Sequence, residues 1–190
     1  MWTLTQFRGA LPARTWQLPK YLGSTHRMFW FDDANGKRIF IAGTFVYEPT
    51  ELVEVPSDTP VTHRVTLYEK GEPIRMFKVD IAKTTCANGE IWWQHPVTNK
   101  QIIVSGTFTC TPLDIEPERL GHYKPAHQIS LFQAGRELGQ WAIRTFDTNS
   151  DQGTIWFTDD FSRLVVIISG EFTFEPKAEP KPDNSRESST

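Results

Sequence analysis

Apolar and polar residues alternate over short stretches of this chain, and one such stretch occurs three times. The copies are Ile39–Pro49 (IFIAGTFVYEP), Ile102–Pro112 (IIVSGTFTCTP) and Val166–Pro176 (VIISGEFTFEP). Residues 62–112 align with 126–176 without a gap and agree at 13 of 51 positions, where ordinary residue usage gives about three by chance. Such repetition predicts units that pack against their own copies.

The second unit shows the pattern of one repeat most clearly. Four alternating runs, separated by turn residues such as Gly71 and Gly89, are expected to form strands: His63–Glu69, Ile74–Ile81, Glu90–His95 and Lys100–Thr111. Stretches long enough for a helix are interrupted by proline. The sequence therefore predicts an all-β protein of about twelve antiparallel strands.

The repeats cover about residues 1–49, 62–112 and 126–176, and short linkers between them favour one domain over residues 1–176. Three four-stranded repeats favour a pseudo-threefold architecture that is β-trefoil-like, with a β-prism-like arrangement as the alternative. Residues 177–190 lack apolar anchors and are expected to be a disordered tail.

The last strand of each repeat has a glycine at its midpoint: Gly43, Gly106 and Gly170. Glycine weakens a strand interior, so these positions predict a bulge or a close backbone approach, which we place near the pseudo-threefold axis. In the first half of the same strands, Phe40, Ile103 and Ile167 are expected to be buried with both faces covered.

Charge and hydropathy limit the classes of partner and the location that the sequence predicts. The net charge is −3 and the pI is about 6.0, with Lys and Arg dispersed, so no nucleic-acid partner is expected. No apolar stretch approaches the roughly 18 residues of a membrane span, and no standard signal peptide is seen, which favours a cytoplasmic protein without a membrane partner. Cys86 and Cys110 are expected to be reduced thiols.

The residues that could bind a metal or act in catalysis each have a structural explanation for their presence. The pairs Asp32-Asp33 and Asp159-Asp160 occupy hairpin ends, where the second repeat has His95-Pro96, and aspartate is a preferred turn residue. His63 and His127 match between repeats but lack partners at a metal-ligand spacing, which favours structural hydrogen bonds. No nucleophile, phosphate-loop or zinc motif is present. We expect no catalytic residue, metal or cofactor.

Aromatic side chains are the remaining functional signal. The third strands contain Phe29-Trp30-Phe31, Trp92-Trp93 and Trp156-Phe157, and neighbouring residues in a strand point to opposite faces. We align Trp30, Trp93 and Phe157 as one equivalent set. These rings are either binding platforms or a second core layer beneath the linkers. Trp93 is expected to be the most exposed and Phe157 the most buried.

Two functions fit these observations. The first is a non-catalytic protein-interaction or assembly module, such as an inhibitor or structural component, with a protein partner. The alternative is a lectin-like carbohydrate-binding module that uses the rings with Asp32, His95 and Asp159. A multivalent lectin should keep the same polar residue beside each ring. Here only two of the three agree, which favours the protein-interaction module.

Overall fold

A computed structural model describes residues 1–19, 23–25, 28–32, 36–51, 53–113, 127–143, 149–151, 153–159 and 163–176. These residues form antiparallel strands and one 3₁₀ turn, η1 (Ile81–Lys83), which confirms the all-β class. The predicted tail, residues 177–190, lies outside the described part of the chain.

Each repeat contains six strands rather than the expected four. The first repeat has β1 (Trp2–Arg8), β2 (Leu11–Leu18), β3 (Gly23–Thr25), β4 (Met28–Asp32), β5 (Arg38–Ala42) and β6 (Phe45–Pro49). The second has β7 (His63–Glu69), β8 (Glu72–Val79), β9 (Thr84–Ala87), β10 (Glu90–Gln94), β11 (Gln101–Ser105) and β12 (Thr107–Pro112). The third has β13 (His127–Gln133), β14 (Arg136–Ile143), β15 (Asn149–Asp151), β16 (Thr154–Thr158), β17 (Val165–Ser169) and β18 (Glu171–Pro176).

One extra strand in each repeat arises at the repeated glycine. Gly43, Gly106 and Gly170 have φ values of +101°, +129° and +140°, which side chains with a Cβ rarely adopt. The long predicted strand is therefore split into two, and the two halves belong to different sheets. The glycines mark the points where the chain passes from one sheet to the next. The other extra strand is short: β3, β9 and β15 pair beside β4, β10 and β16.

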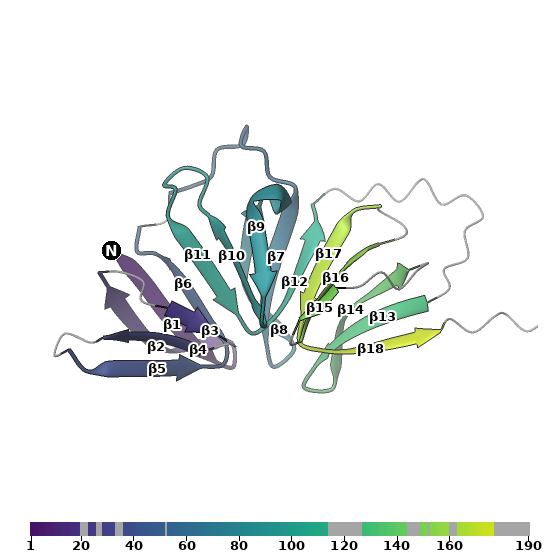
Figure 1. Cartoon of the computed structure of the whole chain (residues 1–190), viewed down its shortest axis with the longest axis horizontal. Helices are drawn as coiled ribbons and strands as arrows, with labels where there is room; N and C mark the ends of the chain where they lie inside the picture. The colour runs from purple at the N-terminus through teal and green to yellow at the C-terminus, as the bar shows by residue number, and fades with distance from the viewer. Residues whose placement is uncertain are drawn as a thin grey trace, which may run out of the picture.

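Neighbouring repeats share sheets. The last strand of one repeat pairs with the fifth strand of the next, so that β6 pairs with β11 and β12 pairs with β17. This creates two six-stranded sheets, β2-β1-β6-β11-β10-β9 and β15-β16-β17-β12-β7-β8. Two three-stranded sheets remain at the ends, β3-β4-β5 and β14-β13-β18. Figure 1 shows the four sheets fanned out in chain order.

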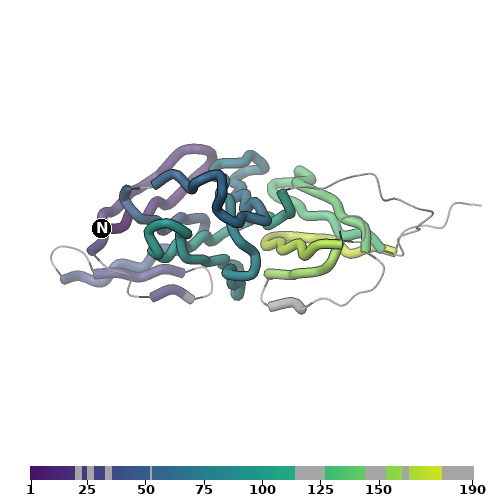
Figure 2. Tube along the Cα trace, turned by 90° about the horizontal axis from the view of Figure 1, so that it is seen from above, coloured from purple at the N-terminus to yellow at the C-terminus, as the bar shows by residue number. Residues whose placement is uncertain are grey.

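The expected closure by pseudo-threefold symmetry is not confirmed. Closure of a β-trefoil or β-prism would bring the third repeat back to the first. Here β5 and β18 lie at opposite ends of the longest axis (Figures 1 and 2), and within the described residues each of them pairs with one strand only. The repeats form an open row because every junction joins one repeat to the repeat that follows it.

The core is divided in the same way. The described apolar side chains form three clusters, each centred on one repeat. A cluster also receives side chains from the next repeat: Ile103 enters the first cluster and Ile167 enters the second. Because burying a large aliphatic side chain stabilises by about 1.5–3 kcal/mol, these intrusions help to hold the repeats together.

Candidate functional site

The aromatic set predicted from the sequence does not form a surface. Trp93 is 4% exposed and Phe157 is 3% exposed, and Trp30 is half-buried. The expectation that Trp93 is the most exposed is wrong, because its ring packs edge-on against Phe77 in the second core cluster, with centroids 5.2 Å apart. The burial of Phe157 is confirmed.

The register of the strands also corrects the alignment of the first repeat. Phe31 pairs with Ile39 as Trp93 pairs with Ile102, and Phe157 occupies the same place opposite Val166. Phe31 is therefore the equivalent of Trp93. Trp30 instead belongs with the half-buried rings Trp92 and Trp156.

The three polar candidates build turns. His95 is buried, and its Nδ1 accepts hydrogen bonds of 3.3 Å from the backbone N–H groups of Val97 and Thr98. Asp159 is buried at the equivalent turn, where its backbone N–H donates to the Leu164 carbonyl at 3.0 Å. Asp32 is exposed and pairs with Arg38, whose Nε lies 2.9 Å from Oδ1. These contacts support the turn interpretation.

One shallow pocket lies beside two of the predicted residues. Trp93 and His95 line it together with Lys78, Asp80 and Asn99, and its volume is about 330 Å³. Lys78, Asp80 and Asn99 supply polar groups to a lining that is otherwise mainly apolar. The nearly complete burial of Trp93 leaves little ring surface for a ligand to stack on.

Two observations concern the possible chemistry of the described residues. No group of three or more His, Cys, Asp or Glu side chains among them could hold a metal ion. Burial raises the pKa of the Cys110 thiol to about 12, with a smaller contribution from Cys86, so Cys110 is protonated at neutral pH.

No helix in the described part of the chain is long and apolar enough to span a membrane.

The open row leaves two unusual surfaces, one at each end. The first, which we call the N-terminal end surface, comprises the free edge of β5 with Phe40, Trp30, Arg8 and Arg14. Phe40 is 60% exposed, whereas Ile103 and Ile167 at the equivalent position are 2% and 5% exposed. The expected burial of Phe40 is wrong, since no described strand pairs with the outer edge of β5 to cover it.

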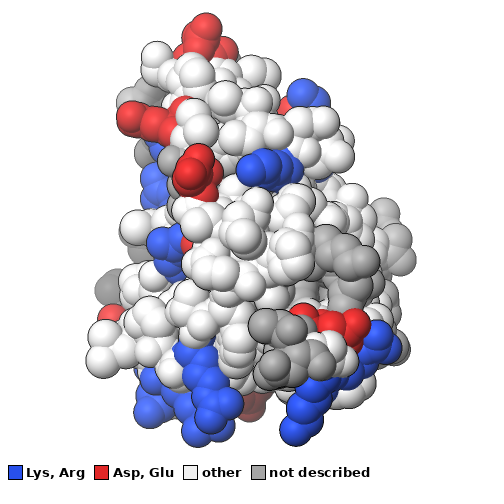
Figure 3. Space-filling model, turned by 90° about the vertical axis from the view of Figure 1, so that its left-hand side faces the viewer, with Lys and Arg blue, Asp and Glu red and all other residues white. Residues whose placement is uncertain are grey.

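The N-terminal end surface is also basic and hollowed. Arg8 and Arg14 are exposed and, together with Gln6 and Ala13, line a shallow depression of about 210 Å³. Neither arginine forms an ion pair with the residues that the structure describes. Figure 3 views this end of the molecule, where Lys and Arg side chains gather along the lower edge of a broad uncharged area, and Asp and Glu side chains lie at the upper left and lower right.

The opposite surface, the C-terminal end surface, comprises the free edge of β18 with Phe172, Phe174, Glu171 and Glu175. The two rings are half-buried and contact the third core cluster. Their equivalents are completely buried in the other repeats: Phe45 and Tyr47 in β6, and Phe108 and Cys110 in β12. Both glutamates are exposed. The two ends therefore carry apolar rings and opposite charges.

Sequence reasoning missed both end surfaces. It expected Phe40 to be buried in the same way as Ile103 and Ile167, which are indeed buried between neighbouring repeats. The missing information was that the row is open. Comparisons with protein-family models, with curated proteins and with solved structures found no match to this chain.

Proposed function

We propose that this chain is a non-catalytic protein-interaction or assembly module whose binding surfaces are the two ends of the row. The observation that supports this most strongly is the exposure of Phe40 at a position where both other repeats bury an isoleucine against a neighbour. In the second and third repeats, the fifth strand packs against the repeat before it. In the first repeat, no described strand pairs with the same edge of the fifth strand.

The physical basis of binding is addition of a strand to a sheet edge. Among the described residues, the outer edges of β5 and β18 have no partner strand, and their backbone donors and acceptors can pair with a strand of another protein. Exposed edges otherwise promote uncontrolled association. Aromatic side chains beside the edge add affinity, because large rings dominate the energetics of interfaces.

A carbohydrate-binding module is the alternative function. The pocket beside Trp93 and His95 supports it, since it combines a ring with polar groups. The burial of Trp93, Phe31 and Phe157 weighs against it, because three equivalent rings that face the core cannot stack on three sugars. Binding of the chain to a glycan array, and its loss in Asn99→Ala at the rim of the pocket, would favour the alternative.

The proposal is tested with tagged full-length chain, chemical cross-linking and affinity capture from the native host. We compare Phe40→Lys with Met76→Lys, because Met76 on β8 is equally exposed at 65% but lies in the middle repeat. Cross-linked protein, whether another protein or untagged copies of the chain, should be lost from the Phe40→Lys sample and retained by Met76→Lys. Equal recovery from both variants would contradict the proposal.

A further inference from the structure

We propose that the protein bound by the ends is a second copy of this chain, joined head to tail so that β18 of one copy pairs with β5 of the next. This inference rests on the proposed function above and names its partner. It follows from treating the two junctions inside the chain as templates for a third.

The two internal junctions have the same register. In the first, Phe45, Val46 and Tyr47 of β6 lie opposite Ser105, Val104 and Ile103 of β11. In the second, Phe108, Thr109 and Cys110 of β12 lie opposite Ser169, Ile168 and Ile167 of β17. The same register at a third junction places Phe172, Thr173 and Phe174 of one copy opposite Ala42, Ile41 and Phe40 of the next.

The apolar side chains of the ends are complementary in this register. Trp92 pairs with Ile103 across β10 and β11, and both contact the core cluster of the preceding repeat. Trp156 and Ile167 do the same at the second junction. Trp30 and Phe40 form the equivalent pair on β4 and β5. At a head-to-tail junction they would pack beside Phe172 and Phe174, whose equivalents are completely buried inside the row.

The space around the glycine where the chain passes from one sheet to the next depends on whether a preceding repeat packs against it. A Cβ at Gly106 would lie 3.0 Å from Oγ1 of Thr44 in the preceding repeat, and one at Gly170 would lie 2.8 Å from Cγ2 of Thr107. A Cβ at Gly43 would meet nothing within 4 Å. Glu171 occupies the position of Thr44 and Thr107 in the third repeat, so in the joined pair it would lie beside Gly43 of the next copy.

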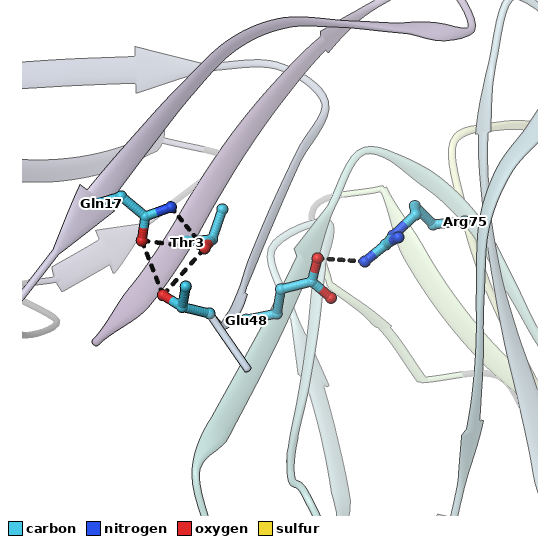
Figure 4. A network of polar contacts seen from close by, with 5 residues as sticks. Thr3, Gln17, Glu48 and Arg75 are labelled. Atoms are coloured by element: carbon cyan, nitrogen blue, oxygen red, sulfur yellow. Dashed lines mark hydrogen bonds and ion pairs between the residues drawn. The ribbon is translucent and has the colours of Figure 1, made fainter. Parts of the chain in front are cut away.

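A first pair of opposite charges matches across the ends. Glu48 of β6 accepts a hydrogen bond from Arg75 of β8 across the first junction (Figure 4). The strand registers make Arg14 the equivalent of Arg75 in the first repeat, and Glu175 the equivalent of Glu48 in the third. The third junction would therefore repeat a glutamate–arginine pair that the first junction already uses.

A second pair arises from another contact at the first junction. Thr44 Oγ1 donates a 2.7 Å hydrogen bond to Oε2 of Glu69. Glu171 takes the place of Thr44 in the third repeat, and Arg8 takes the place of Glu69 in the first, where each ends the first hairpin strand. A hydroxyl–carboxylate contact becomes a carboxylate–guanidinium contact. The depression lined by Arg8 and Arg14 thus lies where two carboxylates of the neighbouring copy would arrive.

One chain cannot make this junction with itself, because β5 and β18 are at opposite ends of the molecule (Figure 2). The contact joins two different surfaces, so repetition of it gives either a closed ring or an open fibre. Both assemblies contain the same β18–β5 junction.

The experiment is sedimentation of the purified full chain between about 1 and about 100 µM, the range in which interfaces of modest size dissociate. The average mass should rise with concentration. Arg14→Glu and Glu175→Arg should each weaken association by about tenfold or more, and the double variant should restore it, because each junction would again contain one charge of each sign. Arg64→Glu, an equally exposed change in the middle repeat, is the matched control and should have no effect.

A mixing experiment tests the polarity of the junction. Phe40→Lys blocks only the N-terminal end and Glu175→Arg weakens only the C-terminal end, so each variant alone should be mainly monomeric at a concentration near the wild-type dissociation constant. Their mixture should form dimers and nothing larger, through the one intact pair of ends. The inference would be overturned if the wild-type chain is monomeric throughout the range, or if neither end variant changes the association. It would also be overturned if the mixture stays monomeric. A monomeric chain that still captures another protein through Phe40 would leave the proposed function standing.

Discussion

The buried ring of His63 bridges two repeats: its Nε2 lies 2.9 Å from the backbone carbonyl oxygen of Val165. Its Nδ1 lies 2.9 Å from Oγ1 of the preceding Thr62. Both ring nitrogens are therefore used, and one contact crosses the junction between the second and third repeats. A residue that could suggest general-base chemistry in the sequence instead joins neighbouring units.

Replacing His63 should destabilise the fold rather than alter chemistry. His63→Ala removes both contacts and leaves a part-buried carbonyl without its partner, for which we expect a loss of about 1–3 kcal/mol in the free energy of unfolding. Denaturant unfolding measures it. Arg64→Ala, an exposed change on the same strand, should stay close to wild type, and an equally small loss for His63→Ala would contradict the bridging role.

The switch glycines should differ in their tolerance of a side chain. Gly106→Ala combines an unfavourable φ with a contact of 3.0 Å to Thr44, whereas Gly43→Ala has the unfavourable φ alone. We expect each φ to cost about 1–3 kcal/mol, with a larger total for Gly106→Ala. Thermal melting of both variants at low protein concentration decides this. Equal midpoints would show that close approach between repeats is not costly.

The buried rings should behave as core. Trp93→Ala and Phe157→Ala should each cost about 3–5 kcal/mol of stability, because both rings are nearly inaccessible. Phe40→Ala should change the stability of the isolated chain little, since its side chain is mainly exposed. Denaturant midpoints distinguish the three variants. A stable Trp93→Ala protein would restore Trp93 as a candidate for a binding surface.

Burial of the Cys110 thiol makes the stability of the fold depend on pH in the alkaline range. Burial raises its pKa from the usual 9.0 to about 12, so the folded state keeps the proton that the unfolded chain releases. This contribution is complete below pH 9.0 and is lost as pH rises through about 12. The wild type should therefore lose stability more steeply over that range than Cys110→Val. Parallel slopes in urea unfolding at several pH values would contradict the prediction.

Alternation of residues was sufficient to predict the all-β class and the repeat, but it missed the short strands β3, β9 and β15 and the division of the long strand at its glycine. The Asp159 and His95 turns were also predictable, because turn residues have local causes. The alignment of Trp30 with Trp93 failed for a local reason as well: residues 33–37 join β4 to β5, whereas the longer segments 95–100 and 159–164 join the equivalent strands. One residue fewer shifts every ring of the first repeat by one position.

The arrangement of the repeats was not predictable in the same way. Alternation indicates which residues share a face of a strand, but it does not indicate which strand lies alongside. Phe45 and Tyr47 would form a core stripe in a closed trefoil and in an open row alike. The strand pairings distinguish the two, because β6 pairs with β11 and β12 with β17 while β5 and β18 each have one described neighbour, and no local pattern in the sequence specifies such pairings.

The shared six-stranded sheets have a consequence for how such a chain can change in length. In a closed threefold protein, a fourth unit would have to break the ring and reset the angle between all units. In the open row, an additional copy of the middle repeat inserted between Pro112 and His127 would pair with β12 through its fifth strand and with β17 through its last strand, as the existing junctions do. It would form two ordinary junctions and leave both termini of the row as they are, so a single gene duplication could produce a longer, folded protein.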